Sequence, residues 1–401
     1  MLKMCNNKTE KTDNISSFNK IETIILFIFI SVVSMFIGIF IGKSKNISDI
    51  DIIKFAEDFK NIEDSYYGEL DKESLLKKAL ETIIDEIDDP YSTVVDQDLS
   101  NSLNTQLQGS YKGIGIEVAN NVENDILIVG IIEDSPASKV NLESGDIIIK
   151  INNEDVSKKD TSILVEKIKT FDGNKLTLTV KRNEKEIIVE IVKETVVLDS
   201  TTSKIIKNGE NKIGYIYINV FAANTGEQFI DELNKLKKNK IDSIIIDVRN
   251  NSGGHLVAVE QILNKMIKSD KVIFQLESKL KREKIYSNGK TDEKLPIVIL
   301  IDNNSASGSE LLAASLKENL NAILVGKTSF GKGTVQEVQN ADNISIQYKL
   351  TTKKWLTPNG NWIHEKGINP DYEVDLDESY LKNPCDATDK QLQKAIEVLN
   401  K

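Results

Sequence analysis

The apolar residues of this 401-residue chain follow three successive spacings. Residues 47–87 carry them at helical spacing, which predicts two amphipathic helices, the second beginning near Asp71. Residues 110–194 carry them in short alternating runs that are typical of half-buried strands. After residue 196 come largely apolar runs, such as 241–248 and 296–301, which are followed by turns rich in Asn, Ser and Gly and then by apolar residues at helical spacing. This last pattern predicts an α/β core with buried strands.

An uncharged run precedes all of these segments. Residues 23–42 contain no charged side chain, and a helix of that length, at ~1.5 Å per residue, would cross about one bilayer core. The run is longer than a typical signal-peptide core, and no Ala-x-Ala-like cleavage site follows it. We therefore predict an uncleaved signal anchor at 21–42. More lysines precede it than follow it closely, which favours a cytoplasmic tail at 1–20 and places the rest on the extracytoplasmic side of the cell membrane.

The overall composition narrows the choice of partners and cofactors. The formal net charge is −11 and no basic block occurs, so we expect no nucleic-acid partner. The two cysteines, Cys5 and Cys385, lie on opposite sides of the predicted anchor and cannot pair within one chain. With His255 and His364 as the only histidines, we predict no disulfide framework, no metal site and no cofactor.

Candidate chemistry lies in two short segments. Ser307 follows the apolar run 296–301 and precedes a leucine stripe at helical spacing, so we place it at or near a helix N-terminus, where free N–H groups can stabilise an oxyanion. Lys332 lies between Gly331 and Gly333, which let the backbone approach another element closely. A serine nucleophile needs a base. Lys332 could be that base only if burial lowered its pKa by about 3 units.

Each feature alone has a simpler interpretation. Ser307 could be an ordinary helix-capping hydroxyl, and Lys332 a solvated loop lysine. Gly326, Gly331 and Lys332 also match the spacing of a phosphate-binding loop. That loop is disfavoured because Gly333 stands where its magnesium-binding Ser or Thr should be, and because a strand-like segment follows instead of a helix.

The two segments together resemble the C-terminal processing peptidases, also called tail-specific proteases. Residues 305–310 match the Ser-Ala-Ser-x-Ser-Glu motif of that family, with Gly308 after the nucleophile in place of the usual alanine, and residues 330–336 match Phe-Gly-Lys-Gly-Thr-Val-Gln. The resemblance implies that Ser307 is the nucleophile, Lys332 the general base and Gln336 the residue that orients the lysine. It also implies a crotonase-like layered α/β protease core. Residues 89–92 match the Asp-Pro-Tyr-Ser segment that precedes the peptide-binding domain in the family.

Residues 110–194 resemble a PDZ domain. The resemblance implies that residues 113–116 form a carboxylate-binding loop whose backbone N–H groups hold a C-terminal carboxylate while the substrate adds as a strand. A dinucleotide loop is excluded there because Val118 stands where the third glycine is due. Lys169 occupies a position where relatives often carry arginine. The predicted peptide-binding residues are Gly113, Ile114, Gly115, Ile116, Ile163, Ile168 and Lys169.

The segment 247–254 resembles the Asp-x-Arg-x-Asn-x-Gly-Gly turn of the same family, with Ser252 where proline is common. The resemblance implies that the backbone N–H of Gly253 or Gly254 completes an oxyanion hole with Gly308. A plain strand-to-helix turn is the alternative interpretation. His255 adjoins the turn, and we interpret it as a helix-start residue.

We thus predict an N-terminal helical region (43–105), a mostly β PDZ domain (106–195), a serine protease core (196–375) and a C-terminal helical tail (376–401). The resemblance implies a membrane-anchored serine endopeptidase that captures unstructured protein C-termini and cleaves them through an acyl-enzyme, and a homodimer formed through the helical region. Two other functions stay open: a non-catalytic PDZ scaffold with a protease-like fold, and a serine protease that depends on His255 or His364. A latent state with the dyad separated is also open.

Overall fold

The computed structural model describes residues 47–95, 107–290, 292–341, 346–377, 380, 382 and 384–400. The predicted cytoplasmic tail and signal anchor, together with Cys5, lie outside these residues. Among the helices that the structure describes, none combines the length and the apolar character needed to cross a bilayer. The chain divides into two compact units, residues 1–79 and 80–401.

Both predicted N-terminal helices are present. Helix α2 spans Ile47–Ser65 and helix α3 spans Lys72–Asp85. The side chain of Asp71 accepts the N–H of Ser74 at 3.1 Å, which fixes the start of α3 where the sequence predicted it. Along α2 several apolar side chains, including Ile52 and Phe55, are more than half exposed.

The segment predicted as a PDZ domain folds as short antiparallel strands around its own hydrophobic core. One sheet has the order β3-β4-β5-β7-β8 with β6 on β5, and β2 pairs separately with β9. Helix α5 (Thr161–Thr170) begins at Asp160, whose side chain accepts the N–H of Ser162. The strands are β2 (Ser110–Gly113), β3 (Ile116–Asn120), β4 (Ile126–Ile131), β5 (Ile147–Ile151), β6 (Glu154–Asp155), β7 (Lys175–Arg182), β8 (Lys185–Val192) and β9 (Glu194–Val197).

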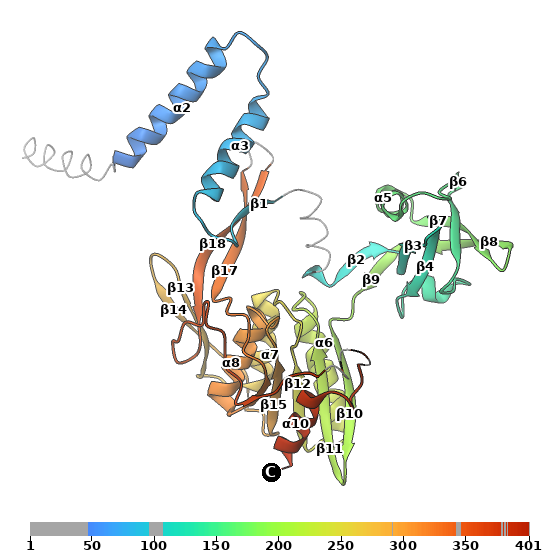
Figure 1. Cartoon of the computed structure of the whole chain (residues 1–401), viewed down its shortest axis with the longest axis vertical. Coiled ribbons are helices and arrows are strands. Elements are labelled where there is room, and N and C mark those ends of the chain that lie inside the picture. Colours follow the sequence, from blue (N-terminus) through green and yellow to red (C-terminus); the bar gives the residue numbers. More distant parts are fainter. Residues whose placement is uncertain are drawn as a thin grey trace, which may run out of the picture. The chain divides into compact units, whose positions relative to one another are not determined.

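The segment predicted as a protease core is built on a six-stranded sheet in the order β10-β11-β12-β15-β16-β19. Four of these strands, β10, β11, β12 and β15, are labelled in Figure 1. The strands β11, β12, β15, β16 and β19 run parallel, and β10 is antiparallel to β11. Every residue of β12 and β15 is buried, as expected for parallel strands covered on both faces. The strands are β10 (Thr201–Asn208), β11 (Asn211–Ile218), β12 (Ser243–Asp247), β15 (Ile297–Ile301), β16 (Ile323–Gly326) and β19 (Tyr372–Glu373).

The two faces of this sheet are covered by different helices. Residues that alternate along one strand belong to different cores: Ile244 packs with helices α6, α7 and α8, whereas Ile245 packs with helix α10. The helices are α6 (Thr225–Lys238), α7 (Leu256–Met266), α8 (Gly308–Leu320) and α10 (Lys390–Leu399). This is the layered α/β arrangement that the sequence predicted.

A second sheet brings the segment that precedes the predicted PDZ domain close to the lysine loop, which is the loop that carries Lys332 between β16 and β17. Its order is β1-β18-β13-β14, and β17 pairs with the other edge of β18. The strands are β1 (Thr93–Val95), β13 (Val272–Glu277), β14 (Arg282–Tyr286), β17 (Thr334–Ala341) and β18 (Ile346–Leu356). Because β1 pairs with β18, the turn just before β1 lies against this sheet, and Thr351 donates its N–H to Ser92 Oγ at 3.0 Å.

The connection between the PDZ segment and the core sheet is short, because strand β9 ends at Val197 and β10 begins at Thr201. Both strands are held by pairing with other segments: β9 pairs with β2, and β10 pairs along its whole length with β11. Local sequence does not predict such long-range pairing.

Candidate active site

Ser307 lies at the N-terminus of helix α8, immediately after the loop that leaves β15. Its backbone has φ 51° and ψ −108°, an uncommon conformation for serine. The neighbouring hydroxyls hold this segment in place, because Ser305 Oγ donates to Val248 O and Ser309 Oγ to Asn251 O, both at 2.8 Å. Ser307 itself is half-buried while its neighbours are buried, so it is the residue of this turn that a substrate can reach.

The glycine turn predicted to complete an oxyanion hole lies directly against Ser307. A Cβ placed on Gly253 would come within 2.9 Å of Ser307 Cβ and 3.1 Å of Gly308 N. The N–H of Gly253 already donates to Asn251 Oδ1 at 2.8 Å. Among the described residues, the N–H groups of Gly254 and Gly308 have no acceptor. The glycine turn therefore lies beside Ser307, and the N–H groups of Gly254 and Gly308 are not used by any described residue.

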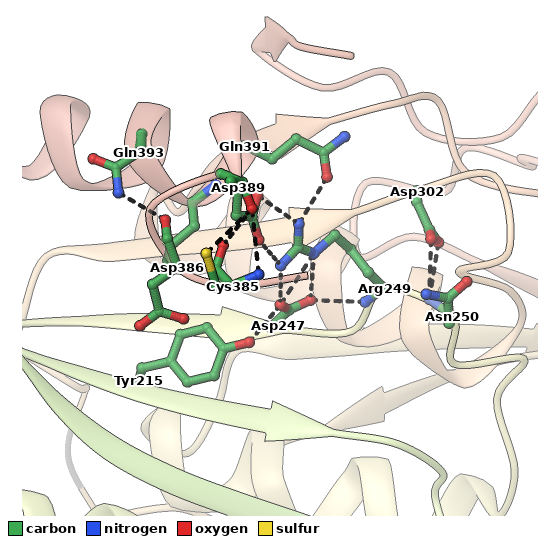
Figure 2. Close-up of polar contacts among 12 residues, drawn as sticks. Tyr215, Asp247, Arg249, Asn250, Asp302, Cys385, Asp386, Asp389, Gln391 and Gln393 are labelled. Carbon is green, nitrogen blue, oxygen red and sulfur yellow. Dashed lines mark hydrogen bonds and ion pairs between the residues drawn. The ribbon is translucent and has the colours of Figure 1, made fainter. Parts of the chain in front are cut away.

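Buried charged side chains hold the start of this turn (Figure 2). Arg249 donates to Asp247 at 2.6 Å and to Asp389 at 2.8 Å, and also to Gln391 at 2.9 Å. Burial disfavours the charged form of Arg249, but the facing carboxylates outweigh this and raise its pKa. On the other side Asp302 accepts the N–H of Asn250 at 3.1 Å. The turn is thus fixed both to the start of α10 and to the loop that carries Ser307.

Lys332 lies in the loop between β16 and β17 and is half-buried. Burial lowers the pKa of Lys332, repulsion from Lys349 lowers it further, and Asp89 and Glu310 oppose the shift. Its Nζ lies 4.8 Å from the ring centroid of Tyr91. Within the described part of the chain, no hydrogen bond joins this Nζ to Ser307 or to Gln336.

Gln336, predicted to orient the lysine, lies on β17 next to a bulge in its pairing with β18. Its amide nitrogen donates to Thr334 Oγ1 and to Thr351 Oγ1, each at 3.0 Å. Gln336 follows Lys332 by four positions, but its side chain binds two threonines and not Lys332.

Neither histidine forms a hydrogen bond with Ser307 among the residues described. His255 is exposed at the start of α7 and donates its backbone N–H to Phe221 O. His364 stacks on Trp362 with ring centroids 5.0 Å apart and accepts the N–H of Gly333 at 3.3 Å. His364 thus supports the backbone of the lysine loop, and the geometry offers no support for a histidine-dependent protease.

The PDZ segment has a groove of about 560 Å³ between β2, β3 and helix α5. The N–H groups of Ile114 and Gly115 have no acceptor among the described residues, which leaves them able to bind a carboxylate. From the helix, Val165, Ile168 and Lys169 line the groove, and Ile163 does not. The three lining residues share one helical face, and Ile163 falls outside it. The other lining residues are Gln108, Ser110, Tyr111, Lys112, Gly113, Ile116 and Leu198.

Sequence reasoning assigned no role to three residues of this site. Glu310 is fully buried and binds the backbone of both Ser307 and Lys332. Its spacing, three residues after a helix-start serine, is the capping-box signature and could have revealed it. Tyr91 and Asp389 contact the site from distant parts of the chain, and no local pattern predicts those contacts.

Comparisons with known proteins match the two segments that carry the candidate site and the groove. The family model for Peptidase family S41 matches residues 212–374, and the PDZ domain model matches residues 112–192. The chain is 36% identical over 349 residues to carboxy-terminal processing protease CtpB of Bacillus subtilis (strain 168), covering 86% of this chain and 71% of the relative. It is 34% identical over 350 residues to CtpA of the same organism, covering 87% and 74%.

A solved structure, the photosystem II D1 C-terminal processing protease, shares the fold. It aligns with a TM-score of 0.50 at 18% identity and covers 84% of this chain and 97% of its own. The curated relatives carry the stronger evidence, since they exceed 30% identity over most of both chains. The chain therefore belongs to peptidase family S41, whose members here include the carboxy-terminal processing proteases, and it is a serine-type peptidase with a PDZ domain.

Proposed function

We propose that the protein cleaves unstructured protein C-termini with a Ser307–Lys332 dyad. The observation that carries the proposal is the position of Ser307: a reachable hydroxyl at a helix N-terminus, beside backbone donors, with a half-buried lysine on the adjoining loop. Helix N-termini favour developing negative charge, and a lysine with a lowered pKa can serve as a base.

The reaction would run in two stages. Neutral Lys332 Nζ takes the proton of Ser307 Oγ while Oγ attacks the scissile carbonyl carbon, and the lysine then returns the proton to the leaving amine. The resulting acyl-enzyme is hydrolysed by water that the same lysine deprotonates. The oxyanion of each tetrahedral intermediate would accept the N–H of Gly308, with Gly254 as the second donor. Gly253 could donate only after its N–H leaves Asn251.

The present arrangement would then be a resting one. Lys332 Nζ lies over Tyr91, and Gln336 is held by Thr334 and Thr351. In the active arrangement the lysine would turn from the ring toward Ser307, and Gln336 would exchange a threonine for the lysine. We propose that the first change is a rotation of the flexible four-carbon side chain of Lys332.

Substrate capture would take place at the PDZ groove. The free N–H groups of Ile114 and Gly115 would hold the terminal carboxylate, and Lys169, exposed at the groove, would add a positive charge. The substrate chain would add as a strand along the groove, which selects for unfolded tails because folded ones have no free strand to offer.

The membrane anchor and the oligomeric state are part of the same proposal. We infer from the sequence that residues 21–42 anchor the protein in the cell membrane, with the protease on the extracytoplasmic side. The apolar side chains exposed along α2 are compatible with a homodimer through the helical region.

The test uses the full-length chain in detergent micelles and a quenched peptide with an apolar, free C-terminus. Wild type, Ser307→Ala, Lys332→Ala and His255→Ala are compared, with Lys327→Ala as the matched control. Lys327 belongs to the same loop but pairs with Glu373 and Asp375 at the surface. We expect cleavage by wild type, His255→Ala and Lys327→Ala only. Full activity of Lys332→Ala would refute the dyad, and loss in a folded His255→Ala would favour a triad.

A further inference from the structure

One buried carboxylate lies between the two catalytic segments. Glu310, in the first turn of α8, has no exposed surface. Its Oε2 accepts the N–H of Ser307 at 2.8 Å and the N–H of Lys332 at 2.9 Å. Its Oε1 accepts the N–H of Gly331 at 2.7 Å and the hydroxyl of Ser329 at 2.6 Å. One side chain thus holds the backbone of the proposed nucleophile and of the proposed base.

These four contacts use the carboxylate fully. An ionised carboxyl group has about four acceptor positions, and each is filled here by a donor. Burial raises the pKa of Glu310, and the four hydrogen bonds act in the opposite direction. One further hydrogen bond, from Phe330 N–H to Ser305 O at 3.0 Å, joins the same two segments without Glu310, but it involves neither Ser307 nor Lys332.

We propose that Glu310 is a positioning residue that locks Ser307 and the Lys332 loop into one rigid unit, and that its carboxylate is required for turnover although it does not touch the substrate. The inference rests on the proposed roles of Ser307 and Lys332. Holding the Ser307 N–H in the φ 51° conformation fixes where its Oγ points and where the next N–H, that of Gly308, faces. Holding the Lys332 N–H fixes the point from which the lysine side chain extends.

Glutamine cannot replace this side chain, although it has the same shape. Three of the four donors are backbone N–H groups, which cannot reverse their direction. If the glutamine NH₂ takes the place of Oε2, it faces the N–H groups of Ser307 and Lys332. If it takes the place of Oε1, Ser329 can rotate its hydroxyl and accept, but Gly331 N–H still faces a donor. In either orientation the bridge, meaning the four contacts by which the Glu310 side chain joins the Ser307 and Lys332 segments, loses at least one backbone hydrogen bond.

The matched control lies on the same helix. Glu318 also accepts a backbone N–H, that of Asn359 at 2.7 Å, but this contact is exposed and remote from Ser307. Glu318→Gln therefore repeats the chemical change on α8 without touching the bridge. Ser329→Ala provides a milder perturbation, because it removes one of the four donors and leaves the carboxylate in place.

The experiment measures kcat, KM and amide hydrogen exchange on the full-length chain for wild type and the three variants. We expect Glu310→Gln to lower kcat by about 100-fold, the usual effect of a misplaced catalytic group, while KM changes by less than about threefold. Exchange should become faster in the peptides covering 303–311 and 327–336 together, and stay unchanged in α6. Ser329→Ala should lower kcat by a smaller factor, and Glu318→Gln should match wild type.

Two results would overturn the inference. One is a kcat for Glu310→Gln within about threefold of wild type. The other is faster exchange in the Ser307 segment alone, since the bridge predicts that both segments loosen together. If amide hydrogen exchange in Glu310→Gln becomes faster throughout the core sheet, that variant has lost its fold, and Ser329→Ala then provides the test. Unchanged kcat and unchanged amide exchange in Ser329→Ala would refute the bridge. Cleavage that persists in Ser307→Ala would instead refute the proposed function, while the exchange data still test the bridge.

Discussion

Replacing Tyr91 by leucine should lower the pKa of Lys332, so that the lysine can act as a base at lower pH. The ring of Tyr91 stabilises the ammonium form, because Lys332 Nζ lies 4.8 Å from its centroid. Cation–π contacts contribute ~0.5–1 kcal/mol at exposed sites and ~2 kcal/mol when desolvated. Lys332 is half-buried, so we take about 1 kcal/mol, which corresponds to a pKa change of about 0.7 units. Leucine removes the ring's electrostatic attraction but still covers the lysine from water.

The assay is the pH dependence of kcat/KM with a C-terminal peptide. Activity should rise with pH as Lys332 loses its proton, and the midpoint of this rise should move down by about 0.7 units in Tyr91→Leu. Well below the midpoint, that shift amounts to about a fivefold faster rate at fixed pH. Asp89, Glu310 and Lys349, which also act on the pKa of Lys332, are present in every variant.

Tyr91→Phe is the control, because it keeps the ring and removes only the hydroxyl. Its midpoint should coincide with that of wild type. The reasoning is refuted if Tyr91→Leu leaves the midpoint in place or moves it to higher pH while Tyr91→Phe behaves like wild type. A shift to higher pH would mean that the ring acts mainly by excluding water, since solvent entry favours the charged lysine.

Three further outcomes follow from the same contacts. Lys349→Gln should move the pH midpoint upward, because repulsion from Lys349 lowers the pKa of Lys332, and a downward move in the same assay would contradict this. Arg249→Leu should lower the unfolding free energy by about 3–5 kcal/mol in urea titrations, because it leaves two buried carboxylates without their cationic partner; a loss below about 1 kcal/mol would contradict this reasoning. Lys169→Ala should weaken binding of a labelled C-terminal peptide about fivefold by fluorescence anisotropy, and an amidated peptide should bind both proteins equally weakly.

The spacing of apolar residues along the sequence predicted those parts of the site whose structure depends on contacts between residues close in the chain. Ser307 was expected at a helix N-terminus because the apolar run before it and the leucine stripe after it both act over a few residues. The same holds for helix α10, found at Lys390–Leu399 within the predicted C-terminal helical tail. The choice of Ile163 for the groove failed because spacing identifies a helix but not which of its faces borders a neighbouring strand.

Long-range contacts explain what the sequence could not show. Tyr91 lies near Lys332 because β1 pairs with β18. The local sequence of neither strand predicts pairing between segments so far apart in the chain. Arg249 was visible in its turn, but its partner Asp389 lies 140 positions away. The resting contacts of Lys332 and Gln336 likewise depend on the register of β17 and β18.

The position of α10 has a consequence for biosynthesis. This helix covers the sheet face formed by Ile245, Val298 and Leu300, and its first residues supply the partner of Arg249. It is also the last described element to leave the ribosome. Until then that face stays bare, and the turn beside Ser307 lacks one of its two anchors. In a nascent or truncated chain the turn beside Ser307 would therefore be less firmly held, and we expect peptidase activity to appear only after this helix has been synthesised.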